Sequence, residues 1–240
     1  MLFSYEDVKN IYPNRVGFNS FLMRSLKSGK IKQIKRGLYA LVNPLTNEIY
    51  ANKFQIASKL FPDSYFSYHE ALEYYGLAVQ SYVSSFVYIS KVRVPDLEFE
   101  EIVYRSKKET INVQKINHLK ENNINVVTLE RAIIDSIDNL HLGGGLEEVE
   151  NALDMCPRID INQVEELLNT YNKSFLYQKV GYLFEKHYGD RIPGKFYNLC
   201  LSKIGSRIFY LESNKLGARL NSKWKLMIKE NYGGLPNELF

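Results

Sequence analysis

A run of forty residues without one acidic side chain constrains this sequence more than any other feature. The run extends from residue 8 to residue 47 and carries eight positive charges. The whole 240-residue chain has a formal net charge of only +4, so the residues outside the run together carry −4. The positive charge is therefore local, and a block of this kind is typical of a surface that meets an anionic partner. The charged residues are Lys9, Arg15, Arg24, Lys27, Lys30, Lys32, Lys35 and Arg36.

The residues around these charges predict two short helices. Ser4 and Asp7 form a capping-box pattern, with Asp in place of Glu, for a first helix that Pro13 ends. Gly17 is expected to break the chain before a second helix, which the pattern places over residues 19–28.

A β-hairpin is predicted after the second helix. Gly29 marks a turn, and the following residues predict strands over 30–34 and 37–42. The tight connection at residues 35–37 is cationic, and Gly37 supplies the positive φ that such turns often need.

The second predicted helix has two distinct faces. Apolar side chains gather on one side of the helical wheel, while small polar and long cationic side chains gather on the other. Such a front suits insertion into the major groove of duplex DNA, where an arginine can read guanine. The alternative is an ordinary solvated face. The apolar face holds Phe18, Phe21, Leu22 and Leu26, and the front holds Ser20, Met23, Arg24 and Lys27.

The helix and the hairpin together predict a winged-helix DNA-binding domain over residues 1–44. About 4 to 6 phosphate contacts would give a log–log salt slope near −4 to −5. The predicted DNA-binding residues are Arg15, Ser20, Arg24, Lys27, Lys30, Lys32, Lys35 and Arg36.

The remainder, residues 45–240, reads as a larger domain that mixes strands and helices, so the predicted fold class is α+β. A short linker is expected over residues 44–47. Strands are predicted over residues 86–94, 99–105 and 125–127. A helix after Thr128 and four later helices follow, and two more strands are expected near the end of the chain.

Neither composition nor motifs indicate an enzyme, a metal, a cofactor or a membrane segment. Cys156 and Cys200 lie far apart without a Cys-x-x-Cys spacing, and the histidines show no ligand spacing. Pro95-Asp96 supplies half of a nuclease motif, but no Glu-x-Lys or Asp-x-Lys follows on a strand within reach. No apolar run approaches the roughly 20 residues that span a bilayer, and the expected location is the cytoplasm.

Four segments resemble the AbiE-type antitoxins, the regulator half of an abortive-infection toxin–antitoxin pair. The hairpin fills a Gly-x-Ile-x-x-Ile-x-Arg-Gly-x-Tyr pattern. Residues 65–77, 126–135 and 222–228 are similar to three later segments of that family, although Lys229 or Glu230 stands where the family's closing strand has Asn. The hairpin pattern is carried by Gly29, Ile31, Ile34, Arg36, Gly37 and Tyr39.

The resemblance implies a cytosolic antitoxin that represses its own operon by binding inverted repeats in its promoter. It also implies that the C-terminal part counteracts a toxin of nucleotidyltransferase fold. A stable complex between the two proteins is not implied.

The helix after Thr128 contains three charged residues that have two interpretations: Glu130, Arg131 and Asp135. Glu130 can favour the positive helix end, and Arg131 can pair with Asp135 at i,i+4. Alternatively, the three residues form a surface that contacts or regulates the toxin.

Two other functions remain open on the sequence. The chain can be a stand-alone winged-helix transcriptional regulator whose C-terminal domain senses a small ligand. The winged helix can also mediate protein contacts alone.

Overall fold

The computed structural model describes residues 1–60, 63–82, 84–109, 116–119, 124–156 and 158–229. The chain forms two compact units, and its fold class is mixed α+β, as predicted. The first unit contains Met1–Tyr74 and Ser81–Thr128, and the second contains Tyr75–Gln80 and the chain from Leu129 onward. The predicted boundary between residues 44 and 45 stays a prediction.

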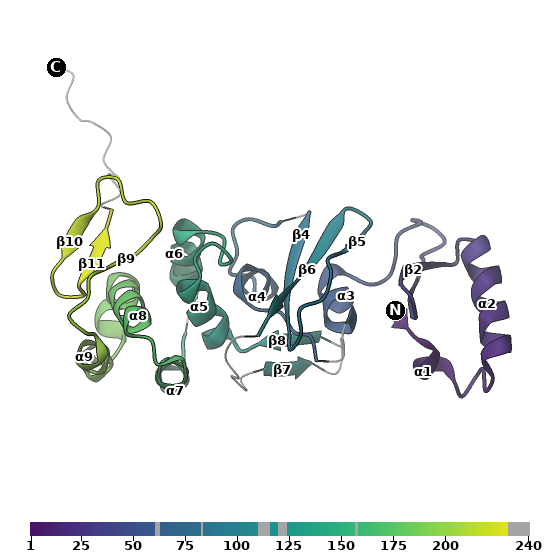
Figure 1. Cartoon of the computed structure of the whole chain (residues 1–240), viewed down its shortest axis with the longest axis horizontal. Helices are drawn as coiled ribbons and strands as arrows, with labels where there is room; N and C mark the ends of the chain where they lie inside the picture. The colour runs from purple at the N-terminus through teal and green to yellow at the C-terminus, as the bar shows by residue number, and fades with distance from the viewer. Residues whose placement is uncertain (61–62, 83, 110–115, 120–123, 157, 230–240) are drawn as a thin grey trace, which may run out of the picture. The chain divides into compact units, whose positions relative to one another are not determined.

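The basic segment folds into a small helix-and-sheet module within the first unit (Figure 1). Its three strands pair antiparallel in the order β1-β3-β2, with a register shift in β2 between Gln33 and Lys35. The predicted hairpin is confirmed within one residue at each strand end. The elements are β1 (Leu2–Phe3), α1 (Tyr5–Val8), α2 (Arg15–Lys27), β2 (Ile31–Lys35) and β3 (Leu38–Leu41).

Helix α2 begins earlier than predicted, and Gly17 does not break the chain. Asn14 caps the helix, because its side-chain oxygen accepts a hydrogen bond of 2.8 Å from the Gly17 backbone N–H. An N-cap satisfies a backbone donor that the helix cannot, and here it offsets the weak helix preference of glycine. The predicted capping box between Ser4 and Asp7 is confirmed in α1.

A mixed β-structure forms the rest of the first unit. Strand β6 pairs parallel with β4 and antiparallel with β5, while β7 pairs antiparallel with β8. Residues 65 and 66 join the two sheets, because Tyr65 bridges to Ile89 and Phe66 bridges to Val126. The elements are α3 (Lys53–Leu60), α4 (Tyr68–Tyr74), β4 (Ser85–Ser90), β5 (Leu97–Phe99), β6 (Ile102–Lys108), β7 (Ile116–Leu119) and β8 (Ile124–Val127).

The single strand predicted over residues 99–105 is wrong. The chain turns at Glu100, whose φ is +55°, and this turn separates β5 from β6.

The linker predicted over residues 44–47 is also structured. The Asn43 N–H donates to the Glu48 carbonyl over 2.7 Å, which closes residues 43–48 into a turn.

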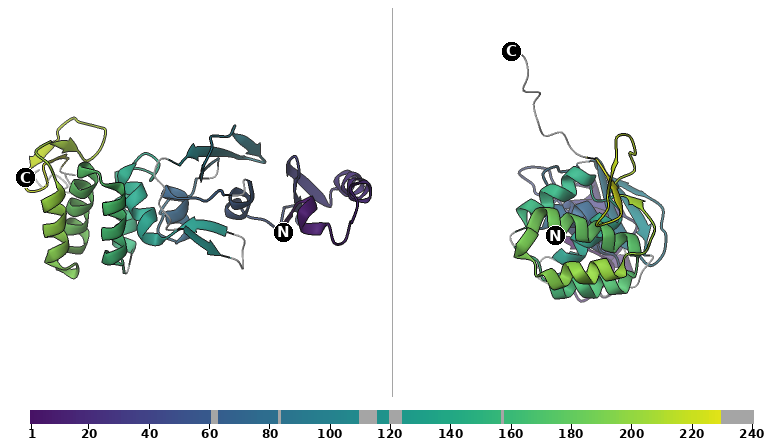
Figure 2. Two further views of the ribbon diagram at one scale, coloured as in Figure 1. Left: turned by 60° about the horizontal axis from the view of Figure 1, so that its bottom comes forward. Right: turned by 90° about the vertical axis from the view of Figure 1, so that its left-hand side faces the viewer.

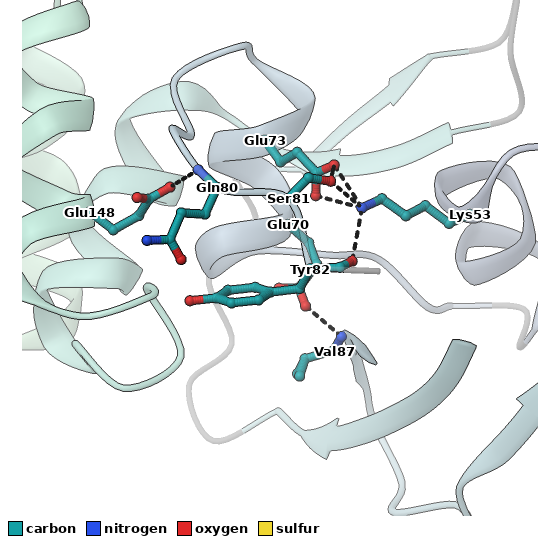
Figure 3. Close-up of polar contacts among 8 residues, drawn as sticks. All are labelled: Lys53, Glu70, Glu73, Gln80, Ser81, Tyr82, Val87 and Glu148. Atoms are coloured by element: carbon teal, nitrogen blue, oxygen red, sulfur yellow. Dashed lines mark hydrogen bonds and ion pairs between the residues drawn. The ribbon is translucent and has the colours of Figure 1, made fainter. Parts of the chain in front are cut away.

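Polar contacts fix helix α4 inside the first unit (Figure 3). The Lys53 ammonium lies 2.6 Å from the Glu73 carboxylate, and Ser81 donates to the same carboxylate over 2.6 Å. The buried Glu70 accepts a 2.7 Å hydrogen bond from the Val87 N–H at the edge of β4. These contacts tie α4 to α3 and to the sheet.

The second unit is helical, with a small sheet in the order β10-β11-β9. Asp160 caps the helix that follows it, because its side chain accepts from the N–H groups of Asn162 and Gln163. Helices α8 and α9 pack together (Figure 2), and a Cβ added at Gly181 would overlap the Trp224 ring, so only glycine fits there. The elements are α5 (Leu129–Asp138), α6 (Leu146–Met155), α7 (Ile161–Tyr171), α8 (Ser174–Tyr188), a 3-10 turn (Gly189–Arg191), α9 (Gly194–Lys203), β9 (Phe209–Tyr210), β10 (Arg219–Asn221) and β11 (Leu226–Ile228).

Candidate nucleic-acid interface

An apolar core orients helix α2. Phe18 and Leu22 are buried on its inner face, and Phe3, Ile31 and Tyr39 from the three strands complete that core. Burying these side chains removes apolar surface from water and fixes the rotation of the helix about its axis. The opposite face of α2 must therefore point to solvent.

The outer face of α2 has the side chains that the sequence predicted. Ser20, Arg24 and Lys27 are all exposed, and the helix contains no acidic residue. Two large apolar side chains share this exposure, since Val16 is 77% exposed and Met23 is 74% exposed. The combination of long cations, a small hydroxyl and apolar tips can contact phosphates, base edges and thymine methyl groups.

Arg15 is the first residue of α2 and Lys30 follows the turn at Gly29, so these two cations lie at the two ends of the helix. Both are exposed, and the Arg15 guanidinium lies 4.7 Å from the centre of the Tyr5 ring. The Arg24 Nε–H donates to the Ser20 carbonyl over 3.2 Å. These contacts hold the two arginines close to the helix without adding a negative charge.

The hairpin cations are placed differently from those of α2. The Lys32 ammonium lies 2.7 Å from the Glu100 carboxylate, and Lys35 donates to the Leu60 carbonyl at the end of α3. Arg36 at the hairpin tip is exposed. The eight predicted residues thus divide into six exposed side chains and two, Lys32 and Lys35, that contact other parts of the first unit.

The ion pair between Lys32 and Glu100 is weak enough to be broken when another anion binds Lys32. Both partners are more than one-third exposed, and such pairs contribute about 0–1 kcal/mol. Burial lowers the pKa of the Lys35 ammonium, so this residue differs from the solvated cations of α2. We define the basic surface as the exposed predicted residues in and next to α2, which leaves out Arg36 at the hairpin tip: Arg15, Ser20, Arg24, Lys27 and Lys30.

Glu130, Arg131 and Asp135 lie in the interior of the second unit, each with at most 9% of its surface exposed. The Arg131 Nε lies 3.3 Å from Asp135, which also accepts from the Tyr171 hydroxyl. Glu130 accepts from the Asp160 N–H over 3.1 Å and so joins α5 to the start of α7. The predicted i,i+4 pair is present, and the burial favours a structural role. Contact with a toxin stays a prediction.

Val16 belongs to the outer face but was not predicted there. Its signal was Asn14, which can cap a helix that already includes Val16 and Gly17. Lys59 was not predicted among the cations near the hairpin either, because only the fold brings α3 to the hairpin tip. There the Lys59 ammonium lies 3.5 Å from Asp7 of α1.

Within the described residues, no group of three or more His, Cys, Asp or Glu side chains could hold a metal ion. A search of the same residues for a helix both long enough and apolar enough to span a bilayer finds none.

No protein-family model matches this sequence, and no curated protein matches it. The fold is similar to that of the RV2827C protein from Mycobacterium tuberculosis, whose crystal structure gives a TM-score of 0.67. The match covers 95% of this chain and 86% of that chain, at 12% sequence identity. At this identity, the likeness concerns the fold alone.

Proposed function

We propose that the chain is a DNA-binding antitoxin that represses its own toxin–antitoxin operon. In this proposal, α2 enters the major groove of inverted repeats in the promoter, and the C-terminal part counteracts a nucleotidyltransferase-fold toxin. The observation that carries the proposal is the outer face of α2, which is cationic, free of acidic residues and held outward by a buried core.

The arrangement around α2 supports a winged helix. A helix with an exposed basic front precedes an antiparallel hairpin, and a short N-terminal strand completes the sheet behind it. Placement of a helix in the major groove is the usual way in which such modules read DNA. The antitoxin part of the proposal depends on the sequence resemblance in the hairpin and in three later segments.

The test of DNA binding compares two triple variants of the full chain. The first is Arg15→Ala, Arg24→Ala and Lys27→Ala on the basic surface, and the second is Arg158→Ala, Lys195→Ala and Lys203→Ala in the second unit. All six side chains are exposed. Anisotropy with a duplex from the upstream region should show at least about a hundredfold weaker binding for the first variant only. Equal binding by both variants would refute the assignment.

The antitoxin role is tested by co-expression with the neighbouring gene's product. We expect the chain with Arg24→Ala and Lys27→Ala to rescue growth while it loses repression of its promoter. The wild-type chain should do both. If the wild-type chain does not rescue growth, the antitoxin role is wrong even if DNA binding is retained.

A stand-alone regulator that senses a ligand is the second candidate. A cavity at the hairpin tip in the first unit favours it. A neighbouring gene without a nucleotidyltransferase-like product would support this candidate over the antitoxin.

A further inference from the structure

A cavity of about 430 Å³ lies inside the first unit, where the tip of the β2–β3 hairpin meets helix α3 and strand β8. Lys35, Arg36 and Leu38 contribute from the hairpin, and Lys59 and Leu60 contribute from α3. Cavities of roughly 300–1,000 Å³ are the size at which proteins bind small molecules. The space is much larger than a single inorganic phosphate needs.

The described wall of this cavity is positively charged. It contains three cations, Lys35, Arg36 and Lys59, and one acid, Asp7, which lies 3.5 Å from Lys59. The net charge of these side chains is +2. A phosphate monoester carries about −1.5 to −2 at neutral pH, so its charge matches the wall.

The cations approach the cavity from two elements that are distant in sequence. Lys35 is partly withdrawn from water, and burial lowers the pKa of its ammonium, so a bound anion would favour the charged form of this side chain. Arg36 at the exposed hairpin tip offers a planar guanidinium that can bind phosphate oxygens in pairs.

The wall also has an apolar part. Leu38 and Leu60 line the cavity, but they are only 4% and 1% exposed, so they are packed behind its surface and offer a ligand little contact area. Asn125 adds an amide at the start of β8. A ligand with a phosphate that meets the cations and a body that fills the remaining space would match this cavity.

We propose that this cavity binds a phosphorylated small molecule of about nucleotide size. Arg36 and Lys59 hold its phosphate, and the rest of the cavity leaves room for its body. The site is independent of DNA binding by α2. A phosphate of the DNA backbone shares the same chemistry, so the experiment must separate the two sources.

Calorimetry on the full chain, without DNA, tests the proposal with common ribonucleoside monophosphates and inorganic pyrophosphate as probes. We expect saturable binding of at least one monophosphate, and no binding of the corresponding nucleoside. Arg36→Gln and Lys59→Gln should each weaken it about tenfold or more, which is the loss expected for a charge-assisted contact. Lys195→Gln, an exposed lysine on α9, should leave it unchanged.

Both test variants should fold, because Arg36 is exposed and the Lys59–Asp7 pair is a partly exposed contact of small energy. A thermal melt of each variant checks this. If no probe binds saturably, or if binding is equal in Arg36→Gln, the proposal is wrong. If only duplex DNA binding depends on Arg36 and Lys59, these cations serve the DNA backbone and the small-molecule site is also excluded.

Discussion

The outer face of α2 and the interior of the second unit use the same residue types in opposite ways. On α2, Arg24 and Lys27 point to solvent on a helix without acids. In the second unit, Arg131 is 3% exposed and lies against Asp135, which is 4% exposed. Burying a charge requires an opposite charge or hydrogen bonds, whereas an exposed charge needs neither.

This difference separates two kinds of experimental effect. A change to a buried charge should lower the free energy of unfolding, because its partner is left without compensation. A change to the outer face of α2 should leave stability nearly constant and alter binding to an anionic partner.

Arg131→Met should destabilise the protein by about 3–5 kcal/mol, because Asp135 would remain buried without its cationic partner. Urea unfolding followed by circular dichroism measures this loss. The control Arg158→Met changes an exposed arginine of the same unit and should stay within about ±0.5 kcal/mol. Equal effects of the two changes would show that the Arg131–Asp135 contact is not a buried ion pair.

Glu70→Gln should flatten the pH dependence of stability. Burial raises the pKa of the Glu70 carboxyl from 4.5 to about 7, so the folded protein holds this proton more tightly than the unfolded chain. Wild-type stability should therefore fall by about 3 kcal/mol as the pH rises from about 4.5 through 7. Glutamine has no proton to lose, and its amide oxygen can still accept from the Val87 N–H.

Unfolding free energies at about pH 5 and about pH 8 test the Glu70 prediction. Glu98→Gln, on β5 of the same unit, is the matched control, since Glu98 is exposed. An identical pH dependence in wild type and Glu70→Gln would contradict the assigned proton.

His187→Gln should remove a smaller pH dependence in the second unit. Two carboxylates raise the pKa of His187: Glu150 lies 3.6 Å from Nε2, and Asp154 lies 2.6 Å from Nδ1. The stabilisation is complete below about pH 6.5 and is lost as the pH rises through the raised pKa. His141→Gln is the control. If stability falls with rising pH by the same amount in His187→Gln as in the wild type, the contacts of His187 are not the cause of that fall.

Local sequence patterns predicted much of this fold because they depend on neighbouring residues. The capping box of Ser4 and Asp7 and the cationic hairpin at residues 35–37 depend on short-range backbone geometry, and the structure has both. The predicted break at Gly17 and the predicted single strand over residues 99–105 were wrong. In each case a single residue outweighed the wider pattern. The Asn14 side chain caps α2 ahead of Gly17, and the positive φ of Glu100 turns the chain.

The candidate site was predictable only in part, for a physical reason. The rotation of α2 follows from its own apolar spacing, so Ser20, Arg24 and Lys27 could be identified as exposed from the sequence, although Leu26 of the predicted apolar face is 37% exposed. The partners of Lys32 and Lys35 could not, because Glu100 and Leu60 reach them only through tertiary folding. The cavity at the hairpin tip depends on the same long-range contacts.

The salt dependence of duplex DNA binding tests the central claim most directly. For the wild-type chain, we expect log Kd to change linearly with log salt, with about one unit of slope for each phosphate contact. Arg24→Ala with Lys27→Ala should reduce that slope by about two, while Lys195→Ala with Lys203→Ala leaves it unchanged. If the slope is the same in the wild type and in both double variants, the outer face of α2 does not bind DNA phosphates.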